Sequence, residues 1–151
     1  MTKKILRYLL IVLIVIIAIS GVSGGVSLMV DPSGASIHLN TSLLESTIFH
    51  NFLVPGIILF LLLGIFPFIA AFGLMTRKKS KFLNRFNPYK KKHWAWAYSL
   101  YCGIILVLWI DFQVMMIGGG YILQSIYATF GVIVIVLTLI PSTIRFYKIK
   151  K

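Results

Sequence analysis

The sequence predicts an all-α membrane protein, with four transmembrane helices in an up-down bundle and a short amphipathic helix in the first outer loop. Of its 151 residues, 59% are hydrophobic and the mean hydropathy is +0.96, whereas soluble domains contain roughly 45–50% apolar residues. Apolar stretches cover residues 5–30, 52–75, 94–117 and 121–140. Each could cross about 30 Å of hydrocarbon as a helix that rises about 1.5 Å per residue. We expect one domain, residues 1–151.

The distribution of cations predicts how the helices are oriented. Three Lys or Arg lie within the first seven residues, at the start of the first apolar stretch, eight lie between residues 77 and 92, and four follow Pro141, whereas the other two connections contain none. Cytoplasmic loops of membrane proteins carry an excess of Lys and Arg. We therefore expect both termini and the basic loop 76–93 to be cytoplasmic. The loop 31–51 and the turn 118–120 then lie on the outer side of the cell membrane.

The first apolar stretch has two interpretations. Cations followed by an apolar segment that ends in small residues, near Ser20 and Gly21, are typical of a signal peptide. The apolar run continues past Gly25 to Met29, beyond a typical signal segment, so we expect a retained helix. Its pairs Ser20/Gly24 and Gly21/Gly25 favour close approach of another helix backbone.

The outer loop contains two local signals. Asp31-Pro32-Ser33-Gly34 matches a type I turn, and Ser42-Leu43-Leu44-Glu45 matches a capping box. Leu43, Leu44, Ile48 and Phe52 then follow at spacings near the helical period. The pattern predicts the short amphipathic helix, which leads into the second span.

Within the second and third spans, five residues suggest structural roles. Gly64 and Pro67 predict a kink, since proline removes a backbone donor that neighbouring helices must compensate. Trp94 and Trp96 are expected to anchor the third helix at the membrane interface. Cys102 stands alone in the sequence, which excludes an intrachain disulfide and favours a small apolar packing role.

The motifs DPSG, LLESTIFHNFLVPG and WIDFQ, together with the glutamine of ILQSIY, cover several parts of the chain. In these motifs the chain resembles an uncharacterised family of small prokaryotic four-span membrane proteins. The resemblance implies a four-helix topology, and it implies no activity, cofactor or catalytic residue.

The basic loop is expected to contact anionic lipid headgroups. A Lys or Arg near such a surface contributes about 1 kcal/mol of attraction. We do not expect nucleic acid as a partner, because no binding fold remains to present these cations. The predicted headgroup contacts are Arg77, Lys78, Lys79, Lys81, Arg85, Lys90, Lys91 and Lys92.

Asp111 places a carboxylate in the third apolar stretch, within the sequence WIDFQVMM. At about 1.5 Å per residue, it lies roughly 21–25 Å beyond an inner interface placed at Trp94 to Ala97, in the outer quarter of the membrane. Asp111 and Gln113 point in directions about 200° apart on an ideal helix. The same topology brings other polar residues to this level, and the predicted ligand-binding residues are Asp111, Gln124, His50, Tyr121 and Gln113, with Asn51 beside them.

This polar cluster admits three interpretations: hydrogen bonds that join helices, a ligand-binding pocket, or a proton-linked transport step. We favour a non-enzymatic membrane protein that acts as an accessory or as a lipid- or small-molecule-binding module. A membrane-protein partner or a homo-oligomer is possible. The alternative is a small ion- or proton-coupled transporter that uses Asp111.

Catalytic chemistry is not expected. His38 and His50 lie in the outer loop and His93 lies at the other side of the membrane, whereas a zinc site needs three or four converging ligands. No nucleophile, base and orienting residue can be assembled on one surface. A quinone-linked enzyme would resemble other small four-helix oxidoreductases, but we expect no metal and no cofactor.

Overall fold

The computed structural model describes residues 2–45 and 47–149, and the side chains of these residues except 2, 3 and 116. The described chain is helical throughout, apart from turns and one isolated bridge between Lys92 and Lys148. Four helices are long and apolar enough to cross a membrane. Their positions follow the four predicted apolar stretches to within three residues at each end.

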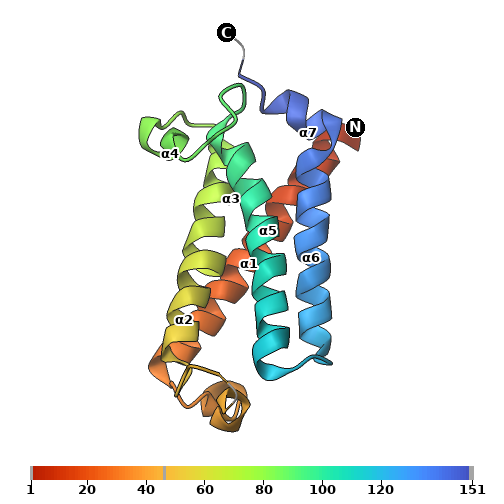
Figure 1. Ribbon diagram of the computed structural model, residues 1–151. Coiled ribbons are helices and arrows are strands. Elements are labelled where there is room, and N and C mark those ends of the chain that lie inside the picture. Colours follow the sequence, from red (N-terminus) through yellow and green to blue (C-terminus); the bar gives the residue numbers. More distant parts are fainter. Residues whose placement is uncertain (1, 46, 150–151) are drawn as a thin grey trace.

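The first long helix, α1, covers Thr2–Val30. The second consists of α2 (Leu53–Leu59), the π-helical segment η3 (Phe60–Ile65) and α3 (Phe66–Thr76). The third and fourth are α5 (Trp94–Ile117) and α6 (Ile122–Leu139). Figure 1 shows each of these helices running opposite to the one before it in the chain, with α1 crossing the others obliquely.

The two ends of the molecule differ in charge. One end, which we call the basic end, contains the start of α1 together with the short helices α4 (Lys81–Arg85) and α7 (Pro141–Phe146) (Figure 1). The loop 31–51 and the turn 118–120 lie at the opposite end, which we call the loop end. All described cations from residue 77 onward fall in segments at the basic end. The predicted grouping of the cations on one side is therefore present in the fold.

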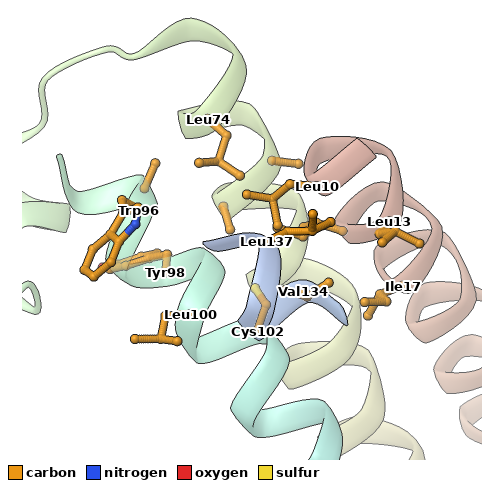
Figure 2. Packing of buried hydrophobic residues seen from close by; sticks show 14 of the residues in the cluster. Leu10, Leu13, Ile17, Leu74, Trp96, Tyr98, Leu100, Cys102, Val134 and Leu137 are labelled. Atoms are coloured by element: carbon orange, nitrogen blue, oxygen red, sulfur yellow. The ribbon is translucent and has the colours of Figure 1, made fainter. Parts of the chain in front are cut away.

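The core is built from all four long helices. Leu10 and Ile17 of α1, Leu74 of α3 and Leu137 of α6 are at most 5% exposed, and Figure 2 shows them converging. Cys102 of α5 lies in the same cluster and is fully buried, as predicted. Long apolar side chains remain exposed on the outer faces, which suits contact with lipid rather than water.

Small residues allow the helices to approach closely. A Cβ added at Gly21 would overlap the backbone of Leu63 in η3, and one added at Gly25 would lie 2.7 Å from Cβ of Phe60. The predicted Gly21/Gly25 pair therefore packs directly against the second long helix. A second close crossing joins α5 to α6, where a Cβ at Gly103 would lie 2.8 Å from the carbonyl oxygen of Gly131.

The irregularity predicted at Gly64 and Pro67 takes the form of the π-helical segment η3. Pro67 has no N–H to donate, and in a regular α-helix its ring would meet the carbonyl group of Leu63. A wider π turn immediately before the proline accommodates both effects. Because Gly21 contacts this same turn, the irregular backbone is covered by α1 rather than by lipid.

The loop 31–51 contains two short 3₁₀ helices, η1 (Ala35–Ile37) and η2 (Thr41–Leu44). The predicted turn is present, since the Gly34 N–H donates to the Asp31 carbonyl at 3.0 Å and Gly34 has φ +78°. The predicted capping box at Ser42 is wrong. Asn40 is the N-cap instead, because its Oδ1 accepts from the Ser42 N–H at 3.0 Å and engages the donor two residues on.

The predicted membrane anchoring by Trp94 and Trp96 is also wrong. Both side chains are buried, at 2% and 4% exposure. The Trp94 indole donates to the Lys78 carbonyl at 2.9 Å, and the Trp96 indole donates to the Thr138 carbonyl at 2.9 Å. Each indole therefore binds another segment of the chain, because a buried N–H needs an acceptor.

Candidate functional site

A cavity of about 250 Å³ lies between the long helices toward the loop end. Most of its wall is apolar, and its polar residues come mainly from the end of α5 and the start of α6. Its apolar wall includes Ile17, Leu59, Leu63, Leu106, Trp109 and Ile110, and its polar wall includes Ser20, Gln113, Tyr121, Gln124 and Tyr127. We call this space the loop-end cavity.

Gln124 is the most deeply buried polar side chain in this wall, with 8% exposure. Its Nε2 donates to the Gly118 carbonyl at 3.2 Å, whereas its Oε1 has no hydrogen-bond partner among the described residues. A buried acceptor without a partner costs about 1–3 kcal/mol. Gln124, a residue of the cavity wall, thus carries a buried acceptor oxygen whose hydrogen-bonding capacity is unused among the described residues.

Three of the five predicted ligand-binding residues line the same cavity. Gln113, Tyr121 and Gln124 come together there, because the turn 118–120 folds the start of α6 back onto the end of α5 (Figure 1). Gln113 also lines an adjoining space of about 70 Å³. The fold therefore brings these three side chains to one cavity, and their role in binding a ligand stays a prediction.

Asp111 and His50 lie elsewhere. Both are exposed, and neither lines the loop-end cavity or the adjoining space. Asp111 is separated from Gln113 by the helical phase predicted from the sequence, so that Gln113 faces the neighbouring helices while Asp111 faces outward. His50 and Asn51 belong to the segment before α2, where the Asn51 side chain accepts from the Leu53 N–H at 3.0 Å.

The cavity opens to the surroundings at the start of α6. Two residues of its wall there, Tyr121 and Leu123, are 48% and 62% exposed. Its volume corresponds to about eight water- or methylene-sized groups, taking roughly 30 Å³ for each. Among the described residues, the wall contains no Lys, Arg, His, Asp, Glu or Cys side chain. Its chemistry therefore suits an uncharged and largely apolar molecule.

At the basic end, seven of the eight predicted headgroup contacts are exposed, namely Arg77, Lys78, Lys79, Lys81, Arg85, Lys90 and Lys91. Lys92 differs, because its Nζ donates to the Ile144 carbonyl at 3.3 Å and lies 5.2 Å from the centre of the Trp96 ring. Burial and the nearby charge of Lys148 lower the pKa of Lys92. Lys92 therefore contacts other parts of the protein. The sequence did not distinguish it from the other cations of the basic loop.

The three histidines do not converge, and no group of three or more His, Cys, Asp or Glu within the described ranges is placed to hold a metal ion. His93 has a structural contact instead. It caps α5, with Nδ1 accepting from the Ala95 N–H at 3.2 Å and Nε2 lying 3.1 Å from the Lys78 carbonyl oxygen. This geometry fits the neutral ring, and burial lowers the pKa of His93.

No protein-family model, curated protein or solved structure matches this chain.

Proposed function

We propose that the chain is a small non-enzymatic integral membrane protein that binds a lipid or another small amphiphilic molecule in the loop-end cavity. The observation that carries the proposal is the unpartnered Oε1 of Gln124 in the wall of an apolar cavity. A ligand that donates one hydrogen bond there would remove the cost of the buried acceptor. The protein is thus a binding or accessory module of the cell membrane.

The membrane arrangement belongs to the same proposal. The helices form an up-down bundle whose termini and basic loop are cytoplasmic, in keeping with the gathering of cations at one end. The loop-end cavity then lies in the outer leaflet and opens toward lipid beside Tyr121 and Leu123. A ligand can enter sideways from the bilayer, without crossing it.

The chemistry of the wall narrows the ligand class. No charged side chain of the described part of the chain lines the cavity, so burial of a charged headgroup there would cost several kcal/mol. An apolar chain of about eight methylene-sized groups fills the available volume. A neutral amphiphile with one hydroxyl or amide N–H therefore fits best, with the donor placed against Gln124.

Quenching of Trp109 fluorescence tests this assignment, because Trp109 lines the cavity while Trp94 and Trp96 lie at the basic end. The matched probes are a six-carbon alkanol brominated at its far end and the methyl ether of the same compound, which lacks the donor. We expect the alkanol to quench at about a fivefold lower concentration, since one hydrogen bond contributes about 1 kcal/mol. Gln124→Leu should abolish this preference.

Asp111→Asn is the matched control, because Asp111 is exposed and does not line the cavity. It should leave the preference for the alkanol unchanged. Equal quenching by both probes in the wild-type protein, or an unchanged preference in Gln124→Leu, would overturn the proposal.

A further inference from the structure

A second concave surface lies at the basic end, between the end of α3 and the C-terminal segment. It encloses about 720 Å³. The residues of its wall that matter here are Thr76, Arg77, Lys79, Arg145, Phe146 and Lys148. We call this surface the basic hollow. Arg145, Phe146 and Lys148 come from a part of the chain distant in sequence from the basic loop, so their meeting with Arg77 depends on the tertiary fold.

Phe146 organises the cations around the hollow. The guanidinium carbon of Arg7 lies 3.5 Å from the centre of the Phe146 ring, and that of Arg77 lies 4.6 Å from it. Cation–π contacts of this kind contribute about 0.5–1 kcal/mol each at exposed sites. The aromatic ring thus contacts one guanidinium group from α1 and one from the end of α3, and the second of these, Arg77, lines the hollow.

No acidic side chain among the described residues lines the hollow. The three acidic side chains of the sequence, Asp31, Glu45 and Asp111, lie in the loop 31–51 or in the loop-end part of α5. The cations of the wall, Arg77, Lys79, Arg145 and Lys148, repel one another as like charges. A bound anion would relieve this repulsion, and guanidinium groups match phosphate oxygens in shape and charge.

The neighbouring groups leave the hollow positively charged. Burial raises the pKa of Tyr147 to about 12, although the charges of Arg7 and Arg77 act in the opposite direction. Its hydroxyl donates to the Leu74 carbonyl at 2.9 Å. His93 lies in the wall in its neutral form. Neither ring therefore supplies a negative charge, and the arginines and lysines determine the electrostatics.

We propose that the basic hollow binds a phosphate group, presented either by an anionic lipid headgroup or by a soluble phosphomonoester. Arg77 and Arg145 supply the charge-assisted hydrogen bonds, while Lys79 and Lys148 add positive charge. The volume exceeds that of a bare phosphate and leaves space for the group to which it is attached. This proposal does not depend on the loop-end cavity or its ligand.

Native mass spectrometry of the full chain in phosphatidylcholine nanodiscs tests the site, with phosphatidic acid as the probe for a lipid phosphomonoester. We expect the wild-type protein to retain phosphatidic acid over phosphatidylcholine. Arg145→Gln and Arg77→Gly should each weaken this retention about tenfold or more. The glycine variant suits the backbone, because Arg77 ends α3 with φ +52°, a conformation that glycine adopts readily.

Arg85→Gln is the matched control, since it removes one exposed cation of the same loop outside the hollow. It should change retention less than twofold. Gln124→Leu should have no effect, which separates this site from the loop-end cavity.

A further arm distinguishes the source of the phosphate. Millimolar inorganic phosphate is added as a competitor of the lipid for the site. If it displaces phosphatidic acid from the wild-type protein but not from Arg145→Gln, the hollow recognises the phosphate group itself. If inorganic phosphate has no effect while phosphatidic acid is retained, the ligand is a lipid headgroup. Equal losses in Arg85→Gln and Arg145→Gln would overturn the proposal in favour of diffuse surface charge. Retention no greater than that of phosphatidylcholine would overturn it as well.

Discussion

At the residue scale, single polar groups decide between structural and ligand-binding roles. Trp96 and Gln124 are both buried, but the Trp96 indole has an acceptor within the chain while the Gln124 Oε1 has no described donor. The first group therefore stabilises the fold, and the second is the acceptor on which the proposed ligand site rests. Asp111, the only acidic residue of the long apolar stretches, is exposed on α5 and lines neither the loop-end cavity nor the adjoining space.

Trp96→Phe should reduce stability. The substitution keeps an aromatic ring but leaves the buried Thr138 carbonyl without the indole donor of α5, which costs about 1–3 kcal/mol. Thermal unfolding in detergent, followed by helical circular dichroism, measures the change. Trp109→Phe is the control, because no hydrogen bond of its indole is found among the described residues, and it should unfold closer to the wild-type temperature.

His93 should make stability depend on pH. Its pKa is lowered in the folded protein from the ordinary value of 6.5, mainly by burial, with the charge of Arg77 acting in the same direction. As the pH falls below 6.5, the unfolded chain takes up a proton that the folded chain does not, so stability decreases until the folded pKa is reached. Above that range the contribution of the neutral ring is fully present.

The variant His93→Asn retains a side-chain acceptor for the Ala95 N–H but has no titrating ring. We expect it to flatten the decrease in melting temperature between about pH 7 and pH 5. His50→Asn changes an exposed histidine of the loop 31–51 and should leave the decrease intact. An unchanged pH profile in His93→Asn would contradict this account of the N-cap.

At the scale of elements, the contact between α1 and η3 is the tightest link between the first two long helices. Gly21 faces the backbone of Leu63, whereas Gly24 faces only the end of the Leu59 side chain, at 3.2 Å from an added Cβ. The same small-residue pattern therefore contains one position that contacts rigid backbone and one that contacts a flexible side chain. The sequence spacing alone does not distinguish these two glycines.

Gly21→Ala should destabilise the protein by about 1–3 kcal/mol, because the added methyl group forces α1 away from η3. Gly24→Ala should change stability by less than about 1 kcal/mol, since the Leu59 side chain can move and alanine favours the helix. Resistance to unfolding in mixed micelles compares the two variants. Equal stability of both would show that α1 and η3 are not in backbone contact.

At the scale of the whole molecule, the separation of charge between the two ends predicts its orientation. The described cations after α1 lie at the basic end, and the loop 31–51 has no Lys or Arg. The fold places that end and the loop end on opposite sides of the four long helices (Figure 1). The basic end should therefore be cytoplasmic, and the loop end should be exposed outside the cell.

Cysteine labelling tests this orientation. The natural Cys102 is fully buried and should give little background. In intact cells, Ser36→Cys should react with a membrane-impermeant maleimide, while Lys90→Cys should react only after the membrane is permeabilised. Both residues are exposed in the fold, so a difference between them reports sidedness. The reverse pattern of labelling would contradict the assignment of cytoplasmic termini.

The sequence by itself determined the four apolar helices, their approximate ends, the turn at Asp31 and the collection of cations into three segments. These features depend on local composition, on helical rise and on the length needed to cross a bilayer. The opposite directions of Asp111 and Gln113 also followed from the sequence, because helical phase depends only on spacing along one element.

Only the tertiary structure decided which side chains meet. The sequence predicted a cluster of five residues at one depth, and the fold joins Gln113, Tyr121 and Gln124 while leaving Asp111 and His50 outside. Depth depends on position along a helix, whereas contact also depends on how neighbouring helices are rotated and packed. For the same reason, the burial of Trp94 and Trp96 and the meeting of Arg77 with Phe146 became visible only in the folded molecule.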